Sequence, residues 1–284
     1  MKIGVVGAGT MGSGIAQTFA MHGYDVTMVD VSDAQLARGL TGIRGSLAKL
    51  AEKKKLDGAP DEIAGRIRTT TDVGTLADAD LVVEAAFEDP AVKRELFATL
   101  DRVTKQDVIL ASNTSSISIG ALAGRTSRPA RVIGMHFMNP VPLMTLVEVV
   151  RGEHTSGDTL DAICDLARTL GKTPVISADR PGFIANRVLM PMINEAFLAL
   201  DEGVGSAEDI DTVMTLGMNH PIGPLRLADL IGLDVCVAIM EVLERDLASA
   251  KYAPAPNLRR YVAEGRLGRK TGRGVYDYRQ GATS

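Results

Sequence analysis

The sequence predicts an α/β protein with two parts: a doubly wound N-terminal domain with a mostly parallel sheet, and an all-helical C-terminal domain. Two observations predict this fold. Short apolar runs alternate with helical segments over the first 180 residues, which is the pattern of a parallel sheet covered on both faces. From Pro181 and Gly182 onward only helical patterns remain. We therefore expect domains at residues 1–182 and 183–284.

The predicted elements follow from these patterns in chain order. The apolar runs expected to form strands are residues 3–6, 25–30, 80–85, 107–112, 131–137, 145–150 and 174–177. In the first domain the two clearest helices are residues 10–22 and 33–55; in the second domain we expect helices at 183–203, 206–217, 224–250 and 257–264. Ser206 and Asp209 are spaced as a capping box, which supports a helix start there. Pro191 lies inside the first helix of the second domain and predicts a kink.

Composition and charge narrow the class of protein. The 284 residues carry a formal net charge of −4, which gives no general attraction to nucleic acid or to a membrane surface. No apolar run approaches the roughly 20 residues that span a bilayer. The two cysteines, Cys164 and Cys236, are far apart in apolar helical runs, a pattern typical of buried thiols in a reducing compartment and not of a disulfide or metal site. The chain begins in a strand without a signal-peptide pattern, so we expect a cytoplasmic protein.

A glycine-rich turn follows the first predicted strand and opens the first helix. Residues 7–12 read G-A-G-T-M-G, which fits the dinucleotide-binding pattern G-x-G-x-x-G. Gly7 permits the tight turn, Gly9 lets a pyrophosphate approach the backbone, and Gly12 lets helix and strand pack closely. The helix N-terminus adds unpaired N–H groups and a positive dipole. The sequence therefore predicts a Rossmann dinucleotide site that includes Gly7, Gly9, Thr10, Met11 and Gly12.

Asp30 ends the second predicted strand, 18 residues after Gly12. A carboxylate there accepts hydrogen bonds from the adenosine ribose hydroxyls and repels a 2′-phosphate. The next basic residue is Arg38. We therefore expect NAD as the cofactor, with NADP as the alternative. The competing interpretation of the whole motif is an ordinary βαβ turn with a surface aspartate.

His136 differs from the other three histidines because it lies near the end of a strand and precedes a segment rich in proline. If the chain reverses near Pro142, Glu148 on the next strand falls opposite His136. A carboxylate beside an imidazole fixes its tautomer and stabilises the imidazolium, which makes a base suited to an alcohol proton. The alternative is a core histidine with an unrelated glutamate.

Residues 112–116 read S-N-T-S-S and directly follow a predicted strand. Ligands of doubly wound sheets bind beyond the carboxyl ends of the strands, so we expect polar groups here to face the ligand. Serine and threonine before a helix also serve as N-caps. Both roles fit together if Ser116 or Ser118 caps the helix while Ser115 faces the ligand.

Together these residues carry a family resemblance. The segments GAGTMG at 7–12, SNTSS at 112–116, HFMNPVP at 136–142 with LVEV at 146–149, PGFIANR at 181–187 and GRKTGRG at 268–274 resemble the L-3-hydroxyacyl-CoA dehydrogenases. The short bacterial 3-hydroxybutyryl-CoA dehydrogenases are most similar. The resemblance runs from residue 1 to about Tyr278. Met138 and Thr145 depart from the family pattern, at positions that concern the shape of the pocket.

The resemblance implies a role for each matching residue. His136 would take the 3-hydroxyl proton, Glu148 would orient it, and Ser115 and Asn186 would contact the reacting end of the substrate. Asn139 would support His136 and the cofactor. The positions implied for NAD are Asp30, Glu84, Lys93, Asn113 and Lys270, and those implied for coenzyme A are Ser46 and Lys53.

A basic helix face agrees with the coenzyme A contacts. The helix after Asp30 carries Arg44, Lys49, Lys53, Lys54 and Lys55. Lys49 and Lys53 are four residues apart and are therefore neighbours on a helix surface. The phosphates of an acyl-CoA are a suitable partner, while a solvated helix end is the alternative for any single lysine.

The sequence thus predicts an enzyme that reversibly oxidises a short (S)-3-hydroxyacyl-CoA with NAD, and a homodimer formed through the helical domain, as in the family. Two other hypotheses remain open. One is a related dehydrogenase acting on a free 3-hydroxy acid or sugar acid. The other is a catalytically silent NAD-binding protein on the same fold.

Overall fold

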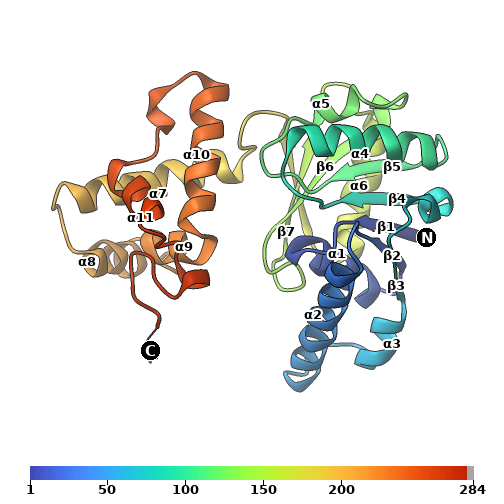
Figure 1. The fold of residues 1–284 in the computed structure, drawn as a ribbon, viewed down its shortest axis with the longest axis horizontal. Helices are drawn as coiled ribbons and strands as arrows, with labels where there is room; N and C mark the ends of the chain where they lie inside the picture. The colour runs from blue at the N-terminus through green and yellow to red at the C-terminus, as the bar shows by residue number, and fades with distance from the viewer. Residues whose placement is uncertain (280–284) are drawn as a thin grey trace. The chain divides into compact units, whose positions relative to one another are not determined.

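A computed structural model describes residues 1–279 and divides the chain into two compact units (Figure 1). The first unit is Met1–Arg180 and the second begins at Pro181. Each unit has its own cluster of buried apolar side chains. The predicted fold class, a doubly wound α/β part followed by a helical part, is confirmed.

One eight-stranded sheet forms the centre of the first unit. Its strands are β1 (Lys2–Val6), β2 (Asp25–Val29), β3 (Ile67–Thr70), β4 (Leu81–Glu84), β5 (Ile109–Ser112), β6 (Val132–Phe137), β7 (Leu146–Arg151) and β8 (Thr173–Ala178). The strand order is β3-β2-β1-β4-β5-β6-β7-β8. Every neighbouring pair is parallel except β6 and β7, which are antiparallel. The carboxyl ends of β1, β2, β4, β5 and β6 therefore share one edge of the sheet with the start of β7.

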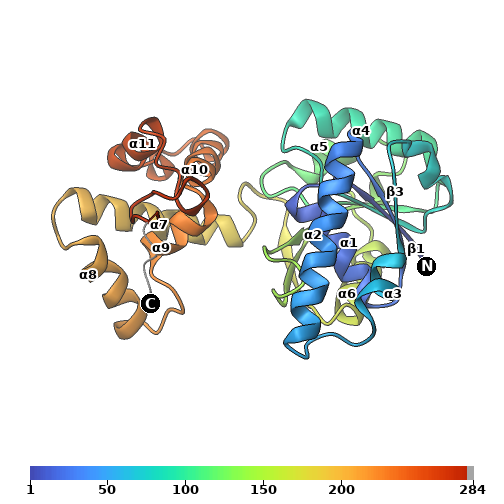
Figure 2. The same cartoon turned by 60° about the horizontal axis from the view of Figure 1, so that its bottom comes forward.

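Helices cover both faces of this sheet. They are α1 (Thr10–Met21), α2 (Asp33–Glu52), α3 (Pro60–Gly65), α4 (Pro90–Val103), α5 (Ile119–Ala123) and α6 (Gly157–Thr169), with short 3₁₀ turns η1 (Val73–Asp78) and η2 (Pro129–Arg131). The helices α1, α2, α3 and α6 share one apolar cluster with the sheet. Figure 1 shows α4 and α5 on the opposite side of the sheet from α1 and α2, and Figure 2 shows the length of α2 beside α1. Both faces are thus buried, as a parallel sheet requires.

Among the described strands of this unit β3 is absent from the predicted set, and the helices without an individually predicted range are α3, α4, α5 and α6. The strand β3 pairs only with β2, lies at the edge of the sheet, and buries fully only Ile67. An edge strand that is charged and polar lacks the apolar run by which buried strands are recognised. Helix α3 has six residues, too few to show a helical repeat.

The second unit is helical. Its helices are α7 (Ala185–Asp201), α8 (Ala207–Thr212), α9 (Pro224–Ile231), α10 (Leu233–Leu247) and α11 (Pro256–Ala263), with short turns η3 (Val213–Gly217), η4 (Ala250–Tyr252) and η5 (Arg269–Thr271). The capping box at Ser206 is confirmed. The single helix predicted over 224–250 is wrong, because Gly232 has a φ of +107° and separates α9 from α10. Within residues 1–279, no helix combines the length and apolarity needed to cross a bilayer.

Candidate active site

The glycine turn lies between β1 and α1, at the edge of the sheet where the parallel strands end. Gly7 has a φ of +106°, and a Cβ on it would meet the carbonyl oxygen of Ala85 at 2.3 Å. A Cβ on Gly12 would lie 1.9 Å from the carbonyl oxygen of Gly7. These two positions therefore require glycine. Gly9 differs, because a Cβ there would meet nothing within 4 Å.

The open space at Gly9 is the observation that fits a dinucleotide. It faces the first turn of α1, which has no side-chain cap hydrogen bond at its N-terminus and begins with Thr10 and Met11. A pyrophosphate placed there receives backbone N–H groups and the positive end of the helix dipole. The residues present thus suit the cofactor that the motif predicts.

Asp30 follows β2 and is tied to the glycine turn. One carboxylate oxygen accepts a hydrogen bond from the backbone N–H of Ala8 at 2.8 Å, and the other accepts one from Ser32 at 3.1 Å. Gln35 donates its side-chain amide to the carbonyl oxygen of Ala8 at 3.2 Å. These contacts fix the carboxylate beside the turn. Gln35 was not among the residues predicted for the site.

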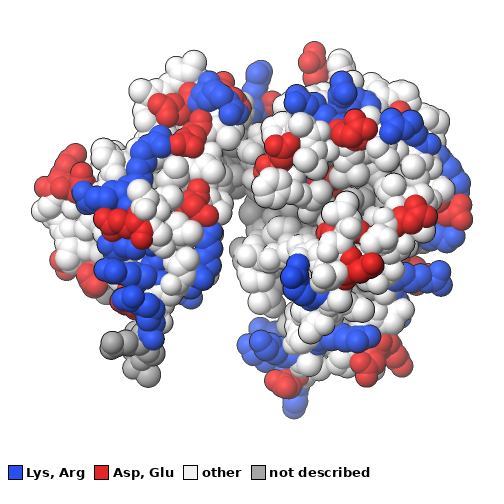
Figure 3. Space-filling model, viewed as in Figure 1, with Lys and Arg blue, Asp and Glu red and all other residues white. Residues whose placement is uncertain are grey.

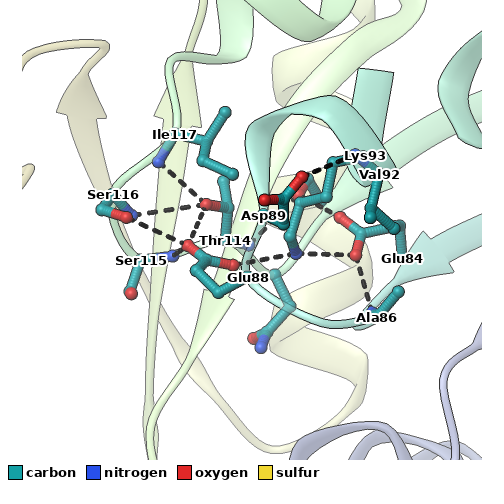
Figure 4. Close-up of polar contacts among 12 residues, drawn as sticks. Glu84, Ala86, Glu88, Asp89, Val92, Lys93, Thr114, Ser115, Ser116 and Ile117 are labelled. Atoms are coloured by element: carbon teal, nitrogen blue, oxygen red, sulfur yellow. Dashed lines mark hydrogen bonds and ion pairs between the residues drawn. The ribbon is translucent and has the colours of Figure 1, made fainter. Parts of the chain in front are cut away.

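Glu84 and Lys93, both implied as NAD contacts, form a buried ion pair. Lys93 is 1% exposed, and its Nζ lies 2.7 Å from Oε1 of Glu84 and 3.0 Å from Oε2 of Glu88. The other oxygen of Glu84 accepts the hydroxyl of Ser112 at 2.6 Å. Figure 4 shows the ammonium group between the two carboxylates. The ends of β4 and β5 and the start of α4 are joined by this cluster.

Glu88 extends the cluster to the predicted ligand loop. Its Oε1 accepts the backbone N–H of Ser115 at 3.0 Å and the hydroxyl of Ser116 at 3.2 Å, and it also accepts the Thr114 hydroxyl (Figure 4). Partial burial by itself raises the pKa of Glu88. The charge of Lys93 and the hydrogen bonds it receives outweigh that effect and hold its pKa below the usual range.

Glu88 is the clearest site residue that the sequence analysis missed. The available signal was its position four residues after the end of β4, at the edge where ligands of doubly wound sheets bind. It was hidden because Asp89 beside it has a sufficient role as the N-cap of α4.

Asn113 links this loop to the strand that carries His136. Its backbone N–H donates to the carbonyl oxygen of Glu84 at 2.7 Å, and its side-chain oxygen accepts the backbone N–H of Phe137 at 2.9 Å. Asn113 thus holds the end of β6 against the end of β5. Its predicted contact with NAD stays a prediction.

His136 and Glu148 come together as a pair. They are directly opposite in the antiparallel register of β6 and β7, and Nδ1 of His136 lies 2.9 Å from Oε2 of Glu148. His136 is 8% exposed and Glu148 is 1% exposed. A largely desolvated carboxylate at hydrogen-bond distance from one ring nitrogen fixes the tautomer that leaves Nε2 as the basic atom. This arrangement suits proton transfer from a hydroxyl group.

A cavity of about 400 Å³ lies between α1, α2 and the loop after β6. The loop contributes Asn139 and its neighbours up to Pro142, the glycine turn contributes Gly9 and Thr10, and α2 contributes Ser46. Asn139 and Ser46, both predicted site residues, therefore share one cavity with the dinucleotide turn. A small ligand in this cavity would reach all three elements.

Lys53 is outside that cavity, at the C-cap of α2. The predicted basic helix face is only partly formed: Lys49 lies in the last turn of α2, whereas Lys54 and Lys55 follow the end of the helix at Glu52. Figure 3 shows blue Lys and Arg side chains interspersed with red acidic ones near the lower end of the first unit, where α2 ends. The predicted coenzyme A contact of Lys53 stays a prediction.

Asn186 and Lys270 belong to the second unit. Asn186 is the second residue of α7 and is 8% exposed. The Lys270 ammonium lies 2.6 and 2.7 Å from the two oxygens of Asp234, in the first turn of α10. Their contacts with substrate and NAD stay predictions.

Over residues 1–279, no group of His, Cys, Asp and Glu side chains is placed to hold a metal ion.

Comparison with known proteins identifies the family. The sequence-family model of the 3-hydroxyacyl-CoA dehydrogenase NAD-binding domain matches residues 2–180. The sequence-family model of the 3-hydroxyacyl-CoA dehydrogenase C-terminal domain matches residues 182–278. The chain belongs to the 3-hydroxyacyl-CoA dehydrogenase family. The family predicted from the sequence motifs is therefore confirmed, and so is NAD as its cofactor.

Members of this family resemble the chain over nearly its whole length. A probable 3-hydroxybutyryl-CoA dehydrogenase of Deinococcus radiodurans is 56% identical over 98% of this chain and 100% of its own. A 3-hydroxybutyryl-CoA dehydrogenase of Bradyrhizobium diazoefficiens is 52% identical over 98% and 95%, respectively. The crystal structure of (S)-3-hydroxybutyryl-CoA dehydrogenase from Ralstonia eutropha, 51% identical, matches with a TM-score of 0.93 over 98% of this chain and 99% of that one.

Proposed function

We propose that this enzyme reversibly oxidises (S)-3-hydroxyacyl-CoA to 3-ketoacyl-CoA with NAD, and that 3-hydroxybutyryl-CoA is its preferred substrate. The observation that carries the proposal is the His136–Glu148 pair, with 2.9 Å between Nδ1 and Oε2, at the sheet edge that also bears the glycine turn. The family and the similarity to 3-hydroxybutyryl-CoA dehydrogenases support the substrate class.

The chemistry of the His136 side chain follows from its partner. Glu148 accepts the Nδ1 proton, which leaves Nε2 of His136 to take the proton of the substrate's 3-hydroxyl group. The imidazolium that forms is stabilised by the carboxylate 2.9 Å away. In the reverse direction the same nitrogen returns the proton to the forming alcohol.

The glycine turn and Asp30 serve the cofactor. Bound NAD supplies the acceptor for the hydride that leaves C3 of the substrate. The open backbone at Gly9 would hold the pyrophosphate, and Asp30 would accept the ribose hydroxyls while its charge disfavours a 2′-phosphate. Ser115, held by Glu88, and Asn186 contact the reacting end of the substrate in this proposal.

A direct assay tests the function. NADH absorbance is followed on addition of acetoacetyl-CoA, longer 3-ketoacyl-CoA esters and free acetoacetate, each with NADH and with NADPH. We expect the highest kcat/KM for acetoacetyl-CoA with NADH. A higher kcat/KM for the free acid would assign a different substrate class. Binding of NADH without turnover of any substrate would indicate a catalytically silent protein.

We also propose a homodimer formed through the second unit, in the cytoplasm. Exposed apolar side chains on that unit support the interface: Val188, Val204, Val213, Leu216 and Met218. The thiols of Cys164 and Cys236 are both buried and free, which suits a reducing compartment. Light scattering on the purified protein should give twice the chain mass, and the mass of a single chain would contradict the interface.

A further inference from the structure

A buried lysine outside the predicted site holds the loop that joins β6 to β7. Lys172 lies between α6 and β8 and is 8% exposed. Its Nζ donates hydrogen bonds to the carbonyl oxygens of Val141 and Met144, each at 2.7 Å. Burial lowers the pKa of Lys172. An ammonium group is rarely buried without such partners, so its contacts with this loop are the structural reason for its position.

The loop held by Lys172 is a wall of the cavity described above. Residues 139–142 line the cavity, and Val141 belongs both to that wall and to the pair of carbonyls bound by Lys172. On the far side, a Cβ added to Gly14 of α1 would lie 2.9 Å from Cβ of Val141. The loop is therefore confined between the ammonium group and α1, and its position sets the width of the cavity.

The His136–Glu148 pair does not depend on this lysine. The pair is set by the antiparallel register of β6 and β7, and the end of β6 is held separately by the side chain of Asn113. A change at Lys172 should consequently move the cavity wall and leave the proton-transfer pair in place. Binding and the chemical step are thus separable at this residue.

We propose that Lys172 is a positioning residue for acyl-CoA binding: by holding the carbonyls of Val141 and Met144 it shapes the side of the cavity beside Ser46, which takes the coenzyme A part of the substrate. This inference rests on the proposed function, because it assigns the side of the cavity beside Ser46 and Val141 to the acyl-CoA and the side beside Gly9 and Thr10 to NAD. If Lys172 contributed only to overall stability, its replacement would weaken the binding of substrate and of cofactor to the same extent.

The test is Lys172→Met, which keeps the length of the side chain and removes both hydrogen bonds. We expect the KM for acetoacetyl-CoA to rise about 10-fold, with kcat and the KM for NADH changing by less than about threefold. Lys105→Met is the matched control, because Lys105 is an exposed lysine paired with Asp78 far from the loop, and its kinetic constants should equal those of the wild type. Unchanged acyl-CoA KM, or an equal rise in the KM for NADH, would overturn the proposal.

A second variant reaches the same loop from the other side. Gly14→Ala places a methyl group against Val141 and favours the helix conformation of α1. It should raise the acyl-CoA KM with kcat retained, even if Lys172→Met does not fold. Binding of coenzyme A to both variants can be measured by calorimetry without turnover. It therefore tests the role of Lys172 separately from the proposed enzymatic function. Weakened binding supports the role of Lys172 even if the wild type proves inactive, and unchanged binding contradicts it even if the wild type is active.

Discussion

Two glutamates at the same edge of the sheet, Glu148 and Glu88, show how one residue type serves two purposes. Glu148 is on a strand, is almost fully buried, and lies opposite the imidazole of His136. Glu88 is in a loop, its side chain is 38% exposed, and it contacts Lys93, Thr114 and the serines after it. The first arrangement acts on the imidazole that we propose as the proton-transfer group, and the second ties several segments together.

The surroundings of each carboxylate determine what its replacement should change. A carboxylate at hydrogen-bond distance from an imidazole nitrogen acts on the protonation of that ring. A carboxylate shared among an ammonium group, hydroxyls and a backbone N–H acts on the position of a loop. We therefore expect changes around Glu148 to alter the chemical step, and changes around Glu88 to alter stability and binding.

The largest effect is expected at the imidazole. His136→Gln should lower kcat by about 10²–10⁴-fold, because the amide cannot accept a proton from the 3-hydroxyl group. NADH binding, measured by fluorescence titration, should be retained. His154→Gln, in an exposed loop, is the control and should keep full turnover. Normal turnover by His136→Gln would contradict the proposed role of the His136–Glu148 pair in proton transfer.

Lys93→Met tests the structural role of the cluster formed by Glu84, Lys93 and Glu88, and we expect it to cause the largest loss of stability. It leaves Glu84 and Glu88 facing one another without the ammonium group between them, and breaking a buried ion pair in this way costs about 3–5 kcal/mol. Chemical denaturation should show the loss as a lower free energy of unfolding. If stability were unchanged while kcat fell strongly, the cluster would belong to the chemistry instead.

Glu148→Gln should lower kcat by about 10²-fold or more while the fold is kept. The glutamine fits the same space, but it removes the charge that stabilises the imidazolium and it can present its NH₂ group to Nδ1. Steady-state rates together with the melting temperature decide this case. If Glu148→Gln loses stability and keeps kcat, the role of Glu148 is structural, like that of Glu88.

The smallest effect is expected from Glu88→Gln. Lys93 keeps its contact with Glu84, so the melting temperature should fall by roughly 2–4 °C at neutral pH. The pKa of Glu88 is lowered in the folded protein, so its charged form stabilises the fold fully above the ordinary value of 4.5. That contribution is lost as the pH falls through the folded pKa. The difference between wild type and variant should accordingly shrink below pH 4.5, and a difference that grows on acidification would contradict the cluster.

The His136–Glu148 pair and the glycine turn were predictable for different reasons. The turn is local, since six consecutive residues supply its glycines and the helix start. The pair is twelve residues apart, yet the prolines after His136 predict a reversal, and the two-residue period of strands then brings Glu148 to the facing position. Ser46 and Asn139 were identified through the family resemblance, and the cavity that joins them is a tertiary feature.

Sequence patterns were sufficient to predict the fold class, the dinucleotide turn, the His136–Glu148 pair and the family, because each is encoded over a short stretch or a regular period. The cluster of Glu84, Lys93 and Glu88 and the contact of Lys172 with the loop of Val141 became visible only in the folded structure. Those contacts join residues 5 to 31 positions apart in different elements. No periodic pattern specifies such pairs, since a buried charge finds its partner only when strands, helices and loops have packed.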